Sequence, residues 1–228
     1  MLNGLDQVSV VIPVLNDWTA LNALLRALTP FGDLEIVVVD GGSEEDSMDE
    51  LQPPVRLVKT ERGRALQLRA GVEATKRPWL WFLHADSEVT GMVVEALEPV
   101  LERVQWGRFD VTFTQDTLWF RLIASVMNER SALTSICTGD QGIFAHRSLL
   151  DRIGGIPNQP LMEDIELSKR LRRISKPIRI RTRLGTSSRR WERDGTLRTI
   201  LLMWELRLRY FFGTSPEVLA AHYYPDGR

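Results

Sequence analysis

The stretch Trp79-Leu80-Trp81-Phe82-Leu83-His84-Ala85-Asp86-Ser87 decides the fold, because an apolar run gives way abruptly to polar residues within it. Residues 79–83 predict a buried strand. His84 and Asp86 stand at its end, two positions apart, so their side chains point to the same side of an extended chain. An imidazole and a carboxylate placed in this way are able to hold a divalent cation, although a strand that merely reaches solvent would carry the same residues.

The first half of the chain alternates between strand patterns and helix patterns. Strands are predicted over residues 8–13, 34–39, 55–59 and 79–83, and helices over residues 18–28, 45–51 and 61–75. Such alternation with short turns predicts an α/β fold with a mostly parallel sheet and helices on both faces. Ligands bind such sheets at the carboxyl ends of the strands. Asp40, His84 and Asp86 all stand at such ends, which indicates a site there.

The second half is less regular and ends in a helix with an apolar stripe. Helices are predicted over residues 92–104, 117–131, 162–173 and 196–212, and strands over residues 109–114, 143–145 and 178–182. The stripe of the last helix consists of Leu197, Ile200, Leu201, Trp204, Leu208 and Phe211. We expect this stripe to pack on its own domain, with a homodimer or a membrane interface as the alternatives.

The composition is that of a globular protein with an uneven charge. The chain has 228 residues and a net charge of −1. Residues 169–209 hold 14 Lys and Arg against three acids, a charge of +11, so the remainder carries −12. This basic segment predicts an anionic partner, or else a solvated helix face. Nucleic acid is disfavoured, because no known binding module with interleaved aromatic residues is recognisable.

The sequence also predicts a cytoplasmic location, with peripheral contact to the inner face of a membrane as an option. Cys137 is the single cysteine, which excludes an internal disulfide and fits a reducing compartment. The N-terminal residues do not have the pattern of a signal peptide. The apolar runs are far shorter than the roughly 20 residues that a membrane-spanning helix needs.

Taken in order, four motifs resemble those of the family-2 glycosyltransferases, which have the GT-A fold. The motifs are Val10-Val11-Ile12-Pro13, Asp40-Gly41-Gly42-Ser43, His84-Ala85-Asp86 and Glu163-Asp164. Residues 63–67, 139–142 and 188–193 resemble one small bacterial subgroup, usually called glycosyltransferases of arsenosugar biosynthesis. The resemblance implies one GT-A domain over residues 1–228. Residues 1–90 would bind the nucleotide sugar, 91–195 would form the acceptor and catalytic half, and 196–228 the C-terminal helix and tail.

The resemblance further implies inverting, metal-dependent transfer of a sugar from a nucleotide-diphosphate sugar, UDP-type favoured, to an acceptor hydroxyl. Asp86 corresponds to the metal-binding acid of the family's Asp-x-Asp motif, with Mn²⁺ or Mg²⁺ as the ion. His84 replaces the first acid of that motif and is a candidate second ligand. Asp40 corresponds to the carboxylate that binds the nucleotide base. Further donor contacts are implied for Pro13, Arg62, Arg64, Gln67 and Arg190.

Catalysis and acceptor binding are assigned by the same resemblance. Asp164 corresponds to the family's catalytic base, and Glu163 would orient it or the acceptor. Acids in the first turn of a helix are also favoured by its dipole without any chemistry. Asp140, Gln141 and Trp191 would lie beside the acceptor. Arg190 and Trp191 match the end of the Gln-x-x-Arg-Trp motif of processive members, where Ser187 replaces the Gln.

Three other functions are compatible with an α/β sheet to different degrees. A non-catalytic sugar-nucleotide-binding protein is the main alternative, motivated by His84 in place of an acid and by Gly41 where the family often has a second Asp. A nucleotidyltransferase would need a Gly-rich, Arg-containing loop after the first strand, where this chain has Val14-Leu15-Asn16-Asp17. A dehydrogenase is disfavoured because no Gly-x-Gly-x-x-Gly follows that strand.

Overall fold

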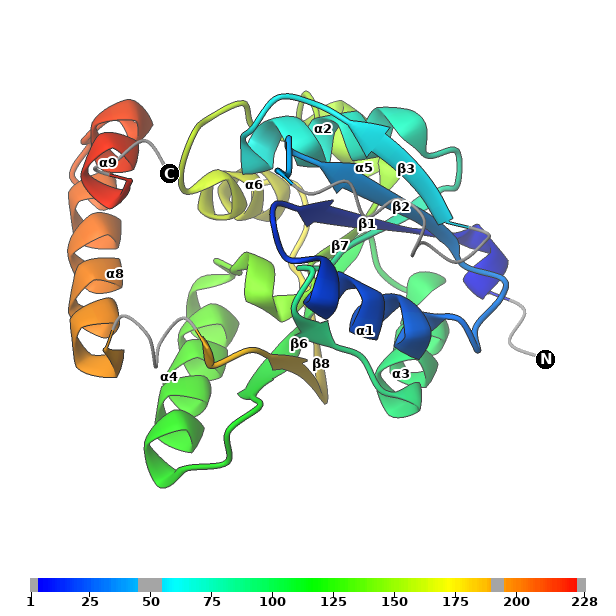
Figure 1. The fold of residues 1–228 in the computed structure, drawn as a ribbon, viewed down its shortest axis with the longest axis horizontal. Helices are drawn as coiled ribbons and strands as arrows, with labels where there is room; N and C mark the ends of the chain where they lie inside the picture. The colour runs from blue at the N-terminus through cyan, green and yellow to red at the C-terminus, as the bar shows by residue number, and fades with distance from the viewer. Residues whose placement is uncertain (1–3, 45–54, 190–194, 225–228) are drawn as a thin grey trace.

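The computed structural model describes residues 4–44, 55–189 and 195–224, and its core is an eight-stranded sheet with the order β3-β2-β1-β4-β7-β6-β8-β5 (Figure 1). The strands are β1 Val8–Val14, β2 Glu35–Asp40, β3 Val55–Lys59, β4 Trp79–Phe82, β5 Ser87–Glu88, β6 Trp106–Phe113, β7 Phe144–His146 and β8 Ile178–Thr186. β1 runs parallel to β2 and β4, β2 to β3, and β6 to β8. The pairs β4–β7, β6–β7 and β5–β8 are antiparallel. The predicted mostly parallel sheet is confirmed.

Helices cover both faces of the sheet. Their bounds are α1 Trp18–Leu28, α2 Arg64–Ala74, α3 Gly91–Leu101, α4 Leu118–Thr134, α5 Arg147–Arg152, α6 Glu163–Arg172, α8 Thr196–Phe211 and α9 Pro216–Tyr223, with 3₁₀ turns η1 Leu5–Gln7 and η3 Gly139–Gln141. In Figure 1, α1 and α3 lie on one side of the sheet and α2, α5 and α6 on the other. The structure thereby shows a GT-A-like α/β fold.

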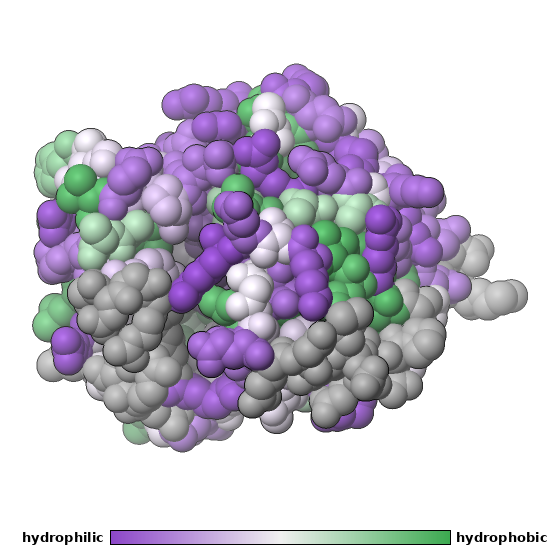
Figure 2. Space-filling view, turned by 45° about the horizontal axis from the view of Figure 1, so that its top comes forward, coloured by the Kyte–Doolittle hydropathy of each residue, from purple (hydrophilic) through white to green (hydrophobic). Residues whose placement is uncertain are grey.

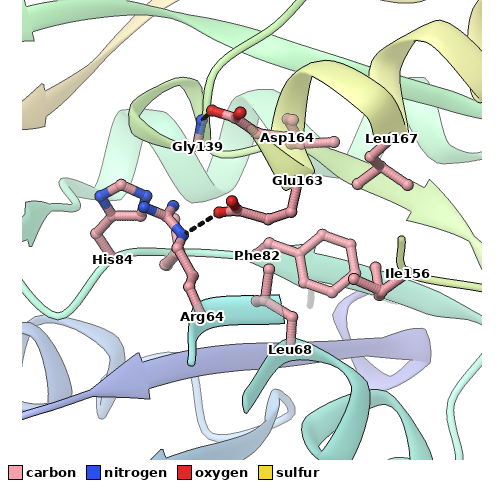
Figure 3. Close-up of a pocket in the computed structure, with 11 residues that line it drawn as sticks. Arg64, Leu68, Phe82, His84, Gly139, Ile156, Glu163, Asp164 and Leu167 are labelled. Carbon is pink, nitrogen blue, oxygen red and sulfur yellow. Dashed lines mark hydrogen bonds and ion pairs between the residues drawn. The ribbon is translucent and has the colours of Figure 1, made fainter. Parts of the chain in front are cut away.

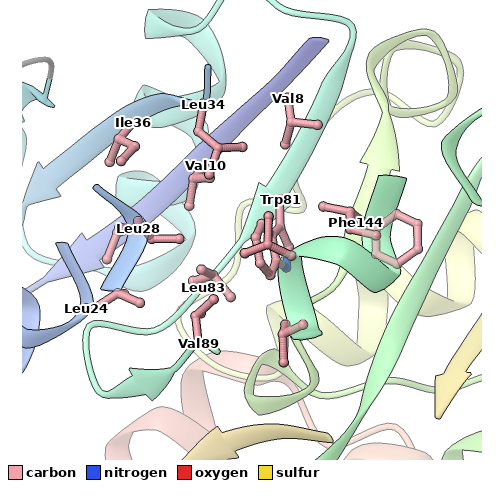
Figure 4. Close-up of a cluster of buried hydrophobic side chains, with 14 of the residues drawn as sticks. Val8, Val10, Leu24, Leu28, Leu34, Ile36, Trp81, Leu83, Val89 and Phe144 are labelled. Carbon is pink, nitrogen blue, oxygen red and sulfur yellow. The ribbon is translucent and has the colours of Figure 1, made fainter. Parts of the chain in front are cut away.

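The two cores follow from the alternation of side chains along each strand. Val10 and Ile12 of β1 join α1 and α3 in one cluster, whereas Val11 joins α2, α5 and α6 in the other. Trp81 is fully buried in the first cluster (Figure 4). A third, smaller cluster joins α4 to β6 through Phe113 and Phe120 among others.

Several local predictions differ from the structure. The helix predicted over residues 61–75 begins at Arg64, because Gly63 adopts a φ of +145° that a helix does not allow. Asp17 stands at the N-cap of α1 but makes no capping bond, and its carboxylate accepts a hydrogen bond from Arg189 instead. α5 and α9 were not predicted. The helix predicted over residues 45–51 lies outside the described residues.

The predicted packing of the last helix is wrong in its choice of face. Leu201, Trp204, Leu208 and Phe211 are 58–76% exposed. The buried side of α8 is centred on Leu206, which packs with Met162, Ile165 and Leu219. The helix carries apolar side chains around most of its circumference, so periodicity could not choose the face that tertiary contacts bury. Figure 2 shows apolar side chains gathered along the edge formed by α8 and α9.

No helix in the described residues combines the length and the apolar character that a membrane span needs.

Candidate active site

A cleft of about 670 Å³ lies at the carboxyl ends of β1 and β4, bounded by α2, η3, α6, α8 and α9. Its size is in the range of small-molecule sites. Side chains far apart in the sequence meet in it. The lining residues include Arg62, Arg64, Gln67, His84, Asp86, Thr138, Asp140, Glu163, Asp164, Thr199, Met203, Arg207 and Tyr223. The predicted convergence of polar residues at strand ends therefore holds for Asp86 and His84.

Asp164 is held in the cleft by peptide N–H groups. Met162 takes the left-handed conformation (φ +64°) at the N-cap of α6, and Asp164 follows in the first turn. Its Oδ2 accepts a hydrogen bond of 3.0 Å from the Gly139 N–H, and its Oδ1 one of 2.7 Å from the Ile165 N–H. The carboxylate is half-buried. It is thus fixed in orientation and still reachable from the cleft.

Glu163, the neighbouring acid, is engaged by a cation. It is 6% exposed, and its Oε1 lies 3.0 Å from Nε of Arg64 (Figure 3). Burial raises the pKa of Glu163, and the charge of Asp164 adds to this while Arg64 opposes it. Burial works against the charge of Arg64, but Glu163, Asp164 and Asp140 together raise its pKa. Of the two adjacent acids, Asp164 is therefore the one available to a substrate.

One ring nitrogen of His84 faces an acid, and the other lies near a cation. Nδ1 lies 3.2 Å from Oδ1 of Asp140. Burial opposes the charge of Asp140, but the hydrogen bond and charge of His84, with Arg64, lower the pKa of that carboxyl to about 2. Nε2 is buried without a hydrogen-bond partner in the described structure and borders Gly139 and Arg64. A Cβ at position 139 would collide with both side chains, so the close approach requires glycine.

Asp86 offers a carboxylate that has no partner among the residues the structure describes. Within the described part of the chain it makes no hydrogen bond and no ion pair, and burial raises its pKa although His84 opposes the rise. No group of three His, Cys, Asp or Glu side chains in the described ranges is placed to hold a metal ion. Mg²⁺ commonly takes one or two carboxylates together with substrate phosphates. Asp86 fits such a site, but His84 does not in this geometry, because Asp140 occupies Nδ1 and the cation of Arg64 faces Nε2.

Two residues predicted to contact the donor use their polar side-chain atoms in hydrogen bonds within the protein. Asp40 is 4% exposed and is not among the cleft-lining residues, and its Oδ1 accepts hydrogen bonds from the N–H and O–H of Ser43. Gln67 borders the cleft, but its Nε2 donates to the carbonyls of Val14 and Val39 at 2.7 and 2.9 Å. This amide ties together the ends of β1 and β2. Pro13 lies within β1 and is likewise not a lining residue.

Of the residues predicted to lie beside the acceptor, one lines the cleft and another does not. Asp140 lines the cleft. Gln141 is fully buried outside it, where Nε2 donates to Ser131 and Oε1 accepts from the Thr138 N–H as part of a capping box. Both polar atoms of its side chain are therefore occupied by hydrogen bonds within the protein. Arg190 and Trp191 lie outside the described residues.

The sequence reasoning missed the wall of the cleft that α8 and α9 form. Thr199, Met203 and Arg207 come from α8, and Tyr223 from α9. The basic segment contains Arg207, but a charge count cannot tell a cleft residue from a solvated one. α9 could have been found, since Ser215 caps it and Pro216 and Glu217 open it, which is a typical helix start.

Comparison with solved structures identifies similar folds. Glucosyl-3-phosphoglycerate synthase from Mycobacterium tuberculosis, in complex with Mg²⁺ and UDP, superposes with a TM-score of 0.61 at 20% identity, over 82% of this chain and 74% of that one. Mannosyltransferase PcManGT from Pyrobaculum calidifontis, in complex with GDP-Man and Mn²⁺, gives 0.60 at 19%, over 78% and 56%. S. aureus TarS 1-349 gives 0.62 at 13%.

These matches cover the relatives to different extents. The chain matches over 80% of its own length but spans 60% of the TarS 1-349 chain and 36% of the TarS chain. None of the curated proteins compared with the chain matches it. The sequence model described as Glycosyl transferase family 2 matches residues 9–151, which is more than half of the chain. On this match and the fold together, the chain belongs to glycosyl transferase family 2.

Proposed function

We propose that this chain is an inverting, metal-dependent glycosyltransferase that moves a sugar from a nucleotide-diphosphate sugar, UDP-type favoured, to an acceptor hydroxyl. The observation that carries the proposal is the presence in one cleft of Asp164, held by the Gly139 N–H, and of Asp86, whose carboxylate has no hydrogen-bond or ion-pair partner among the described residues. Family membership and neighbours solved with UDP, GDP-Man, Mg²⁺ or Mn²⁺ support it.

The proposed reaction needs a single base. Asp164 accepts the proton of the acceptor hydroxyl as that oxygen attacks the anomeric carbon, and the bond to the diphosphate oxygen breaks on the opposite side of the ring. The configuration is thereby inverted without a covalent sugar–enzyme intermediate. Glu163 is held by Arg64, so it positions that arginine rather than acting as a nucleophile.

The diphosphate leaves with negative charge that the site has to stabilise. Arg62 and Arg64 line the cleft and supply guanidinium groups, which pair well with phosphate. Asp86 would hold Mn²⁺ or Mg²⁺, and that ion would supply further positive charge to the leaving group. In this proposal residues 1–90 bind the donor and 91–195 provide the base and acceptor side.

Two substitutions test the proposal against a matched control. Asp86→Ala and Asp164→Asn should each lower sugar transfer by at least about 100-fold while the protein stays folded, because each removes a separate requirement of the reaction. Asp151→Asn, an exposed acid on α5, should leave the rate unchanged. The assay is release of UDP from a panel of UDP-sugars with Mn²⁺. Full activity of either site variant would contradict the proposal.

A second candidate is a non-catalytic sugar-nucleotide-binding protein. The contact of His84 with Asp140, at the position of a metal-binding acid, favours it. Slow hydrolysis of a nucleotide sugar by the wild-type protein would decide for the enzyme, since both candidates bind the donor.

Two finer assignments extend the proposal. The motifs at residues 63–67, 139–142 and 188–193 support placement in the bacterial subgroup named for arsenosugar biosynthesis. The exposed side of α8, centred on Trp204, supports peripheral contact with a membrane that carries anionic lipids, because its apolar side chains belong to the same stretch of sequence as the basic residues of segment 169–209. A homodimer through α8 is the competing occupant of that surface.

A further inference from the structure

We propose that the acceptor is an amphiphile, a hydroxyl group carried on an apolar chain or ring, whose apolar part lies along the side of the cleft that α8 and α9 form. This inference rests on the proposed function, because it names the class of acceptor that the transferase would use. The observation behind it is the uneven polarity of the cleft, whose lining is mostly charged or polar at the strand ends and largely apolar along α8 and α9.

The apolar side of the cleft is continuous with the proposed base. Met162 and Ile165 stand on either side of Asp164 in the sequence, and both line the cleft. They pack with Leu206 of α8 and Leu219 of α9 in one cluster. Together with Met162 and Ile165, the apolar wall consists of Leu161, Met203, Ala220, Ala221 and Tyr223. An acceptor whose oxygen reaches Asp164 therefore has an apolar surface beside it.

Polar contacts also fix α8 to α6. The hydroxyl of Tyr210 in α8 donates to Oε2 of Glu166 in α6 at 3.3 Å. Nζ of Lys169, also in α6, lies 4.3 Å from the centre of the Tyr210 ring. The apolar wall is therefore held beside the base by contacts within the fold and does not depend on a ligand for its position.

α8 contributes few free polar groups to this side of the cleft. Thr199, Met203 and Arg207 lie one turn apart, and all three line the cleft. The Thr199 hydroxyl donates to the carbonyl of Gly195 at 3.0 Å, so it is already satisfied. Arg207 is the one charged residue among the described lining residues of α8 and α9. A polar acceptor would find few partners here, and burying its polar groups unpaired would be costly.

The row of α8 residues that faces the cleft leads to the exposed apolar side of the same helix. Residues three and four apart are neighbours on a helix, so Arg207 adjoins Trp204 and Phe211. These two aromatic side chains are 64% and 76% exposed. An apolar chain that leaves the cleft past Arg207 would meet them, and burial of apolar surface on both partners would favour its binding.

A pair of ligands that differ only in chain length tests the inference without requiring turnover. Methyl and hexyl β-glucoside, both used as monomers in solution, are titrated calorimetrically into the protein with UDP and Mn²⁺ present. The hexyl compound should bind the wild type at least about tenfold more tightly, since each buried methylene strengthens binding roughly three- to fourfold.

Two variants of the wall and one matched control locate the effect. Met203→Gln and Ala221→Glu should each reduce the advantage of the hexyl compound to about threefold or less, because each places a polar group in the wall. Val218→Glu introduces the same charge at an exposed position of α9 that does not line the cleft, and it should retain the advantage.

Three results would overturn the inference. They are equal binding of both compounds by the wild type, an advantage that both wall variants retain, and an advantage that Val218→Glu loses to the same extent as the wall variants. Displacement of UDP by the hexyl compound would also count against it, because the wall would then belong to the donor. Wild-type protein that binds the hexyl compound as expected but hydrolyses no nucleotide sugar would instead count against the proposed function.

Discussion

At the residue scale, the two acids in the first turn of α6 carry the same functional group but differ in their environment. Glu163 is buried against Arg64, whereas Asp164 is half-buried and oriented by the N–H of Gly139. The helix dipole favours both equally. Arg64 of α2 pairs with Glu163, and the carboxylate of Asp164 is therefore left available to a substrate.

Among the described residues, Nε and Nη2 of Arg130 in α4 are shielded from solvent without a hydrogen-bond partner, which leads to a prediction on stability. Burial lowers the pKa of Arg130 to about 10, well below its ordinary value, so the charged form is less favourable in the folded than in the unfolded chain at neutral pH. Arg130→Met should therefore stabilise the protein by about 1–2 kcal/mol. For a chain of this length the melting temperature should rise by roughly 2–4 °C per kcal/mol, as calorimetry would show.

The prediction for Arg130→Met has a matched control on α8. Arg198→Met removes an exposed charge from α8 and should leave the melting temperature within about 1 °C, since exposed charges contribute little. If Arg130→Met melts lower than the wild type, the guanidinium contributes net stability and the prediction is wrong.

Cys137 provides a prediction on reactivity. Burial raises the pKa of its thiol to about 11. Because the thiolate is the reactive species, the native protein should react only slowly with an aromatic disulfide reagent at pH 8, and the unfolded protein within seconds. Reaction should become faster as the pH approaches 11. Rapid stoichiometric labelling of the native protein at pH 8 would show that the thiol is exposed to reagent.

At the element scale, α8 has two sides with different roles. Its inner side packs Leu206 against α6 and α9 and turns Arg207 toward the cleft. Its outer side exposes Leu201, Trp204 and Leu208. α8 thus forms one wall of the candidate active-site cleft and presents an apolar outer surface, and under the proposed membrane contact it would place a membrane-bound acceptor near Asp164.

The membrane proposal predicts a specific loss. Wild-type protein should float with vesicles that contain phosphatidylglycerol, and Trp204→Glu should reduce the bound fraction at least about fivefold, because it places a negative charge in the apolar surface. Met92→Glu is the matched control, since Met92 is 69% exposed on α3, away from this surface. Binding that survives Trp204→Glu would remove α8 as the contact. A concentration-dependent dimer that Trp204→Glu dissociates would assign the surface to a second copy.

At the scale of the whole molecule, the sequence predicted what short-range patterns determine. The strand over residues 8–13 and the helix over residues 18–28 agree with β1 and α1, because their apolar spacing matches a buried strand and an amphipathic helix. Asp86 and Asp164 reach one cleft because strand ends and helix starts meet at the same edge of the sheet.

The features that were not predicted depend on contacts between distant parts of the fold, and local sequence patterns do not reveal such contacts. Gln67 is drawn to carbonyls 53 and 28 residues away, so its amide is directed toward the strands. Gln141 is taken up by its own capping box and by Ser131. The buried side of α8 was chosen by contacts with α6 and α9, which no local periodicity records.

The central claim is that Asp86 and Asp164 do different work over one cleft, the first in binding the donor and the second in removing a proton. Calorimetric titration of UDP in the presence of Mn²⁺ tests this division most directly. The account predicts that Asp164→Asn binds UDP within about twofold of the wild type although it does not transfer sugar, whereas Asp86→Ala binds at least about tenfold more weakly. Equal affinities in both variants, or loss of binding in Asp164→Asn alone, would contradict it.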